Sequence, residues 1–198
     1  MGRNSKALCK KKEIISKYNS SANFYDKRYK SLQEEKYRIL LENCELMGKI
    51  ILDIGSGTGL LLEYILQYQD VLNILFIGVE ISWEMISEFK NKILNLSDNS
   101  YIQLVLGDIE NLPFRDKSFN LTFSVTSFQN LPNILKGIQE SLRIAKSGSS
   151  LKISILRKKL KLNTILNLLK PCVNNLEIIN KKNIEDVIIQ GELIKDSI

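Results

Sequence analysis

The sequence predicts an α/β fold in which a doubly wound, mostly parallel sheet carries helices on both faces. Short apolar runs rich in Ile, Leu and Val recur along the chain without the polar alternation that a half-exposed strand shows. Segments with helical periodicity separate these runs, and strict alternation of strand and helix favours parallel pairing with right-handed crossovers. The expected strands are residues 50–54, 74–79, 102–106, 119–125 and 150–156.

The segment before the first strand is polar and basic. We expect residues 1–14 to form a flexible basic tail and residues 15–198 to form a single domain, because 198 residues of which 44% are hydrophobic can bury one core but not two. Within that domain, residues 15–48 are expected to be a helical lead-in. Helix is predicted from about residue 13 to residue 43, with a break near residues 19–21.

The end of the first strand carries the most informative pattern in the chain. Asp53 is followed by glycines at alternate positions, Gly55, Gly57 and Gly59, and then by an apolar segment with helical periodicity. Glycine allows the backbone to turn sharply off a strand and to approach a ligand closely. A helix that begins near Thr58 points its unpaired N–H groups at the same place. The segment therefore predicts a nucleotide-binding loop.

Two further acids follow the next two strands in the same way. Glu80 ends the second apolar run, and Asp108 follows the third. Each alone is compatible with an ordinary solvated loop residue, but three acids at three successive strand ends are harder to assign to chance. A carboxylate at such a position can accept hydrogen bonds from two adjacent hydroxyl groups.

The rest of the chain continues the alternation of helix and strand. Helical periodicity recurs between or after the expected strands, and two short apolar runs follow Pro171. The expected helices are residues 59–69, 82–94, 131–145 and 160–169, and the two late runs are residues 176–180 and 187–194.

The spacing Gly-x-Gly-x-Gly after an acid, in place of Gly-x-Gly-x-x-Gly, resembles motif I of the class I S-adenosylmethionine-dependent methyltransferases. Residues 111–120, NLPFRDKSFN, and residues 142–151, LRIAKSGSSL, resemble two later segments of the same family. In the second segment, Ser147 and Ser149 stand where proline and glycine are usual, which loosens the expected turn. The resemblance covers about residues 25–156 and suggests the small methyltransferases related to quinone-biosynthesis and RNA-modifying enzymes.

The resemblance implies a Rossmann-like sheet of seven strands with an antiparallel last strand, and S-adenosylmethionine as the cofactor. It assigns Glu80 to the two ribose hydroxyls and Asp108 to the adenine amino group, with Ile81 and Ile109 on the two faces of the base. Ser124 in the fourth strand and the residues of the glycine loop complete the expected cofactor site. The loop residues are Asp53, Gly55, Ser56, Gly57 and Gly59.

Aromatic residues in the N-terminal segment resemble the lead-in that many small methyltransferases fold over the cofactor. Tyr25 is the first choice to cover the methionine end, through cation–π attraction to the sulfonium, and Tyr18 is the second. The alternative is that both tyrosines pack a helix onto the core. Trp83 either borders the adenine pocket or packs at the start of a helix.

Methyl transfer from a sulfonium requires little of the protein beyond alignment of the acceptor and exclusion of water. The chain has no histidine, which excludes Ser-His-Asp chemistry and zinc sites with histidine ligands. Methyl transfer needs neither, so the absence of histidine is compatible with it. The acceptor must still lose its proton, and candidate groups lie in residues 126–132, but no catalytic residue is assigned. No metal is expected, because the three cysteines are scattered: Cys9, Cys44 and Cys172.

Charge is distributed unevenly along the chain. Residues 1–30 hold nine basic and two acidic side chains, so this N-terminal arm carries the positive excess of a chain whose net charge is +6. A second basic cluster, Arg157, Lys158 and Lys159, follows the fifth strand at the edge where α/β sheets bind ligands. Both segments fit contacts with RNA or another anionic molecule. The alternative is that these lysines serve solubility alone.

Three functions remain open on the sequence. The first is methyl transfer to an N or O atom of RNA or another anionic substrate, and the second is transfer to a small metabolite such as a quinone precursor. The third is a non-catalytic subunit with the methyltransferase fold that works with a small protein partner. Because the chain lacks a long apolar stretch, we expect no membrane span, no secretory signal and a cytoplasmic location.

Overall fold

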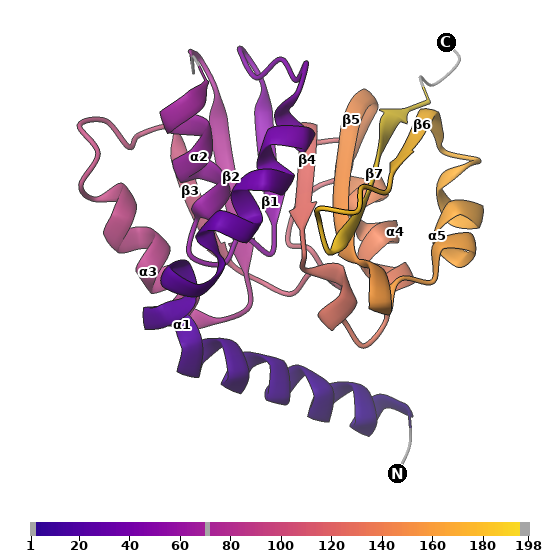
Figure 1. The fold of residues 1–198 in the computed structure, drawn as a ribbon, viewed down its shortest axis with the longest axis horizontal. Coiled ribbons are helices and arrows are strands. Elements are labelled where there is room, and N and C mark those ends of the chain that lie inside the picture. The colour runs from indigo at the N-terminus through magenta and orange to yellow at the C-terminus, as the bar shows by residue number, and fades with distance from the viewer. Residues whose placement is uncertain (1–2, 70–71, 195–198) are drawn as a thin grey trace.

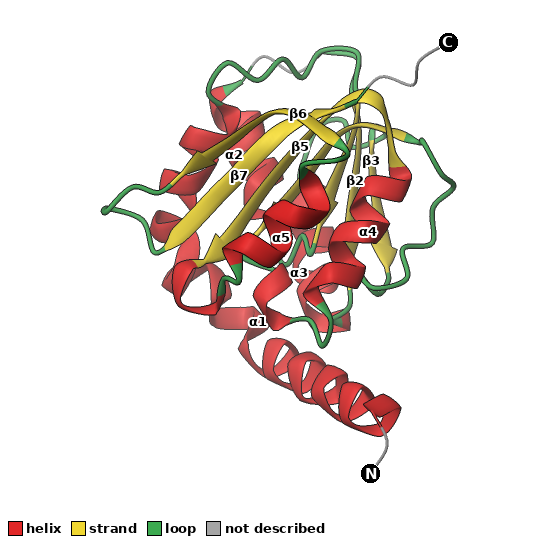
Figure 2. Cartoon of the chain, turned by 90° about the vertical axis from the view of Figure 1, so that its right-hand side faces the viewer, coloured by secondary structure: helices red, strands yellow, loops and turns green. Residues whose placement is uncertain are grey.

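A seven-stranded, mostly parallel sheet forms the centre of the molecule, and helices cover both of its faces (Figure 1, Figure 2). The computed structural model describes residues 3–69 and 72–194. The strand order is β3-β2-β1-β4-β5-β7-β6, and only the pairs β5–β7 and β7–β6 of this sheet are antiparallel. The strands are β1 Ile50–Ile54, β2 Leu75–Glu80, β3 Ile102–Leu106, β4 Phe119–Val125, β5 Ala145–Leu156, β6 Val173–Ile179 and β7 Asp186–Leu193.

The helices that follow the first strand lie close to the predicted positions. No helix within residues 3–69 and 72–194 is both long enough and apolar enough to cross a membrane. Two short 3-10 turns follow β4 and β5. The helices are α1 Arg3–Leu41, α2 Leu60–Tyr68, α3 Trp83–Ile93, α4 Ile134–Ile144 and α5 Leu162–Leu169, and the turns are η1 Phe128–Asn130 and η2 Arg157–Lys159.

Each face of the sheet has its own apolar core, because successive side chains of a strand point to opposite faces. In β1, Leu52 and Ile54 pack in the core that α4 and α5 cover, whereas Ile51 packs in the core that α1, α2 and α3 cover. Figure 2 shows α4 and α5 on one face of the sheet with α2 behind it. The predicted doubly wound, mostly parallel fold is confirmed.

The N-terminal helix α1 extends much further than expected. The flexible tail predicted over residues 1–14 is wrong for residues 3–14, which are helical, and residues 1–2 lie outside the described residues. The helix contains neither proline nor glycine, so nothing in the segment forces it to end. Figure 1 shows its N-terminal part running below the sheet and its C-terminal part turning up against it.

The break predicted near residues 19–21 is also absent from the assigned helix. The Ser20 hydroxyl donates to the carbonyl of Lys17, and the Ser21 hydroxyl donates to the carbonyl of Tyr18. Such bonds allow serine to remain inside a helix, where they often bend it. The polar stretch is therefore compatible with a continuous helix.

Strand β5 begins earlier than the sequence suggests. Ala145 follows α4 directly and pairs with Phe119, and Ser150 pairs with Leu121. Residues 146–149 therefore bulge out of the ladder at the place where a turn was expected, and Gly148 adopts a φ of 73° there.

We predict that Gly59→Ala destabilises the fold by about 2–5 kcal/mol, from about 1–2 kcal/mol of left-handed backbone strain and about 1–3 kcal/mol of overpacking. Gly59 has a φ of 82°, and a Cβ would lie 2.3 Å from the buried ring of Phe89. Gly48→Ala is the matched control, because its φ is 71° but a Cβ meets nothing within 4 Å. Urea unfolding should show the larger loss for Gly59→Ala, and equal losses would contradict the packing argument.

Candidate functional site

The loop between β1 and α2 is held in the left-handed conformation at all three of its glycines, with φ values between 54° and 82°. Its first turn is fixed to β2, because the N–H groups of Gly55 and Ser56 both donate to the carbonyl of Val79. A Cβ at Gly55 would lie 2.6 Å from the Ser127 side chain, whereas a Cβ at Gly57 would meet nothing within 4 Å. The loop therefore leaves open space beside Gly57.

Glu80 ends β2, is buried, and accepts hydrogen bonds from this loop. Its Oε2 accepts the N–H of Gly57 at 3.1 Å, and its Oε1 accepts the N–H groups of Ile81 and Ser82, both at 2.9 Å. Burial raises the pKa of the Glu80 carboxyl, and the three N–H groups act in the opposite direction. The carboxylate is fixed in orientation, with lone pairs left for a ligand.

Asp53 lies beneath the loop. It is only 3% exposed, and burial together with the negative charge of Glu80 raises its pKa to about 8. A carboxyl in this position is therefore largely protonated near neutral pH. It is not among the residues that line the cavity described below.

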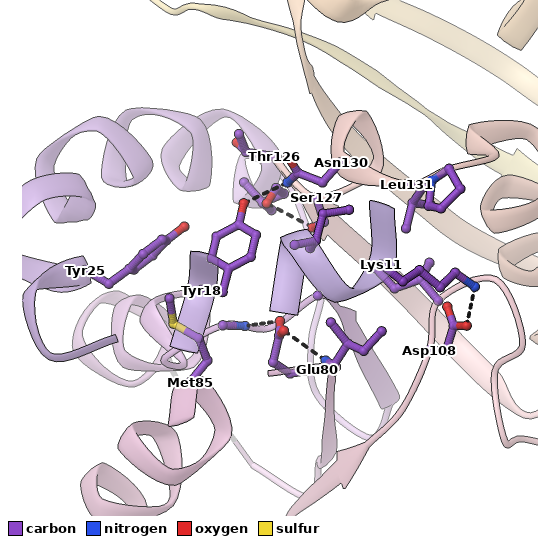
Figure 3. Close-up of a pocket in the computed structure, with 17 residues that line it drawn as sticks. Lys11, Tyr18, Tyr25, Glu80, Met85, Asp108, Thr126, Ser127, Asn130 and Leu131 are labelled. Atoms are coloured by element: carbon purple, nitrogen blue, oxygen red, sulfur yellow. Dashed lines mark hydrogen bonds and ion pairs between the residues drawn. The ribbon is translucent and has the colours of Figure 1, made fainter. Parts of the chain in front are cut away.

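Asp108 follows β3 and forms an ion pair that the sequence did not suggest. Its Oδ1 accepts the N–H of Glu110 at 2.9 Å, and its Oδ2 lies 2.5 Å from the ammonium of Lys11 on α1 (Figure 3). The same ammonium lies 2.5 Å from Oε2 of the buried Glu110. Burial opposes ionisation of Asp108, but the Lys11 ammonium and the Glu110 N–H lower its pKa overall.

A cavity of about 60 Å³ lies between these strand ends and α1 (Figure 3). It brings together residues from the glycine loop, from β2 and β3, and from the loop after β4. Most of the residues predicted to bind the cofactor line it: Gly55, Gly57, Glu80, Ile81, Asp108, Ile109 and Tyr25.

Four predicted residues do not line the cavity. Ser124 is fully buried in β4, with its Oγ 3.4 Å from Ser127 Oγ, and Gly59 backs onto the ring of Phe89. Asp53 and Ser56 are buried, and Ser56 Oγ has no hydrogen-bond partner among the described residues. For these four residues the expected cofactor contact stays a prediction.

Two tyrosines of α1 form one wall of the cavity. Tyr18 and Tyr25 both line it, with ring centroids 6.4 Å apart, and the Tyr18 hydroxyl accepts a hydrogen bond from Asn130 Nδ2 at 2.7 Å. Burial raises the pKa of Tyr18 to about 12 and raises that of Tyr25 as well. Trp83, by contrast, is exposed at the start of α3 and lies outside the cavity lining.

A buried charged cluster, Lys36–Thr126–Asp186, adjoins the same cavity. Lys36 Nζ lies 3.0 Å from Asp186 Oδ1 and donates to Thr126 Oγ1 at 2.8 Å, while that hydroxyl donates to Asp186 Oδ2 at 2.8 Å. Thr126 lines the cavity and has a φ of 56°, a strained value for a β-branched residue. Sequence reasoning placed only Thr126 near the site, because its two partners come from the distant elements α1 and β7.

The basic segments are partly used within the chain. Lys10 donates to the carbonyl of Leu131 at 2.6 Å, in addition to the ion pairs of Lys11. Arg157 donates to Asn180 Oδ1 and to two backbone carbonyls in the β6–β7 connection. Lys158 and Lys159 are exposed. Part of the positive charge that the sequence suggested for binding an anionic substrate is therefore used in contacts within the chain.

Comparison with known proteins identifies one family. The profile of the methyltransferase domain matches residues 52–153, just over half of the chain. A demethylmenaquinone methyltransferase of Desulfitobacterium hafniense is 33% identical over 102 residues, which are 51% of this chain and 40% of that protein. The first curated relatives are covered over 27% to 53% of their own length, so the chain spans about half of them or less.

Solved structures share the fold at low sequence identity. The magnesium protoporphyrin IX methyltransferase of Synechocystis, with bound S-adenosylmethionine, superimposes with a TM-score of 0.73 at 16% identity, covering 93% of this chain and 97% of that chain. A chain from the Haloferax volcanii complex that contains the Trm112 methyltransferase activator superimposes with a TM-score of 0.69 at 14% identity, covering 89% and 97%.

We predict that Asp53 makes the protein less stable as pH rises from about 5 to about 8. In this window the folded carboxyl keeps a proton that the unfolded one, with its ordinary pKa of 3.8, has released, so the free energy of unfolding falls with rising pH. Asp53→Asn should flatten this dependence in urea titrations at several pH values. Glu42→Gln, which removes an exposed carboxylate, should leave it unchanged. Parallel curves for wild type and Asp53→Asn would contradict the shifted pKa.

We predict that Asp186→Asn destabilises the protein by about 3–5 kcal/mol, because it leaves the buried Lys36 ammonium without its counter-ion. Urea unfolding at neutral pH measures the loss. The double variant Lys36→Met with Asp186→Leu is the control, and it should lose less stability than Asp186→Asn, since it removes both charges together and leaves only the Thr126 and Ser154 hydroxyls without their acceptor on Asp186. A loss below about 1 kcal/mol in Asp186→Asn would show that the pair contributes little.

Proposed function

The chain belongs to the methyltransferase domain family, and from this premise we propose that it transfers the methyl group of S-adenosylmethionine to a small acceptor. The proposal rests on one observation: the glycine loop, Glu80 and Asp108 all line the same cavity. Three strand ends from separate parts of the chain supply these groups. The family and its cofactor follow from the sequence match, and the acceptor is the part that we infer.

The residues present fit the cofactor in chemical type. Gly57 offers space that a side chain would fill, and Glu80 offers a fixed carboxylate for the ribose hydroxyls. Asp108 offers a second carboxylate for the adenine amino group, beside the apolar side chains of Ile81 and Ile109. We assign residues 15–198 to one catalytic domain, in which residues 15–48 form the lid.

The cofactor supplies an activated methyl group on sulfur, and the protein must align an acceptor with it and keep water out. When bound, S-adenosylmethionine would give its methyl group to the acceptor atom and remain as a neutral thioether, while the acceptor would release one proton. The Tyr18 and Tyr25 rings line the cavity on the side of α1. Thr126, oriented by Lys36 and Asp186, presents a polar group on the acceptor side.

The acceptor that fits best is a small, largely apolar molecule. Beyond the cofactor residues, apolar side chains of Ile14, Val125, Leu131 and Pro132 form much of the cavity wall. A relative acts, by its name, on demethylmenaquinone, a quinone-type compound. The RNA alternative loses support because Lys10 and Lys11 of the basic arm bind the protein itself.

A non-catalytic or partner-dependent subunit is the second candidate. β3 is an edge strand of the sheet, and Leu106 at its end is 53% exposed. Unpaired edges with exposed apolar residues are places where another chain can add a strand. The complex with the Trm112 activator shows that a protein of this fold is found with a partner. Failure of the isolated chain to bind the cofactor would favour this function.

We predict that the purified chain binds S-adenosylhomocysteine in calorimetric titration and that Glu80→Gln weakens binding about tenfold or more. Hydrogen bonds to a charged group contribute about 1.5–3 kcal/mol. The glutamine amide also places an N–H donor where the carboxylate of Glu80 has only acceptors. Glu84→Gln, on an exposed carboxylate of α3, should bind like wild type. No binding by wild type, or equal binding by Glu80→Gln, would contradict the assigned site.

The acceptor class is tested with labelled-methyl S-adenosylmethionine and two substrates, a reduced demethylmenaquinone analogue and total transfer RNA. We expect transfer to the quinol with little dependence on salt. Transfer to RNA that falls steeply with salt would favour the RNA alternative, since phosphate contacts release counter-ions.

A further inference from the structure

We propose that Lys11 is a latch: its ammonium holds α1 closed over the cofactor site by occupying, on Asp108, the place of the adenine amino group. The inference rests on the proposed function, which assigns Asp108 to adenine. Lys11 has no role in the proposed function itself. The latch gives the N-terminal arm a role other than substrate binding.

The contact geometry makes Lys11 and the base mutually exclusive. Lys11 Nζ lies 2.5 Å from Asp108 Oδ2 and 2.5 Å from Glu110 Oε2, so two of its three N–H groups point at carboxylates. Glu110 is itself fixed, because its Oε1 accepts the N–H of Asn133 at 2.6 Å. The remaining oxygen of Asp108 accepts a backbone N–H from Glu110. Asp108 Oδ2 also accepts a hydrogen bond from Asn111 Nδ2 at 3.4 Å, so both lone pairs of this oxygen are in use and an amino group of the base competes with the Lys11 ammonium for it.

The same arm is attached to the rim of the cavity at two further points. Lys10 Nζ donates to the carbonyl of Leu131, and the Tyr18 hydroxyl accepts from Asn130 Nδ2. With these contacts made, Lys11, Ile14 and Tyr18 of α1 line the cavity beside Glu80 and Asp108. A base that takes the place of Lys11 on Asp108 breaks the Lys11 ion pairs and thereby loosens the attachment of this part of α1.

This coupling has a thermodynamic consequence. If the closed arm and the bound base exclude each other, the measured affinity for the cofactor is lowered by the fraction of molecules that are closed. Removing the Lys11 ammonium should raise that affinity. Salt should do the same in the wild type, because it screens partly exposed ion pairs. This sign is opposite to the one expected for a basic residue that binds an anionic ligand.

The test compares wild type, Lys11→Met and Lys12→Met by titration with S-adenosylhomocysteine, which carries no net charge. Methionine keeps the apolar stem of lysine without the ammonium. Lys12 is a matched control, because it lies next along α1, carries the same charge and is exposed. We expect Lys11→Met to bind about fivefold or more tightly than wild type, and Lys12→Met to bind like wild type. Between about 0.05 M and about 0.5 M NaCl, affinity should rise in wild type but not in Lys11→Met.

Amide hydrogen exchange supplies a readout that needs no ligand. In the ligand-free state, residues 5–20 of α1 should exchange faster in Lys11→Met than in wild type or Lys12→Met, because the arm is released. Equal or weaker binding by Lys11→Met, with unchanged exchange, would reject the latch and leave the proposed function intact. Failure of all three proteins to bind S-adenosylhomocysteine would reject the proposed function and the latch with it.

Discussion

Both faces of the sheet are covered, and this constraint determines where the chemistry of the molecule can lie. A strand buried on both sides carries apolar side chains along its length, so polar groups gather where the strand ends. Because β1, β2 and β3 are parallel neighbours, Asp53, Glu80 and Asp108 emerge at the same edge. Burial at that edge then sets their behaviour, since it raises the pKa of Asp53 and Glu80 while Lys11 keeps Asp108 charged.

The sheet and its edge could be predicted because their signals are local. Apolar runs, glycine spacing and the acid after each run all lie within a few residues of one another, and the strands and helices appear close to the expected positions. The contacts that complete the site have no such signal. Lys11 and Asp108 lie 97 residues apart, and Lys36 and Asp186 come from α1 and β7. Pairing between single charged residues at such separations leaves no periodic pattern in a sequence.

The N-terminal arm shows how a correct observation led to a wrong expectation. The segment is basic and polar, which is typical of a solvated tail. It is nevertheless helical in residues 3–14, because it contains no helix breaker and because Lys10 and Lys11 attach it to the rim of the site. The positive charge of this arm is thus directed inward at two positions.

One unbroken helix reaches both ends of the cavity, since α1 contributes Lys11 beside Asp108 and Lys36 beside Thr126. The contacts at both ends of the cavity therefore depend on the position of one element of secondary structure. The continuity of the helix goes with the absence of glycine and proline between residues 3 and 41, so the two ends of the cavity share one rigid support in place of two independent ones.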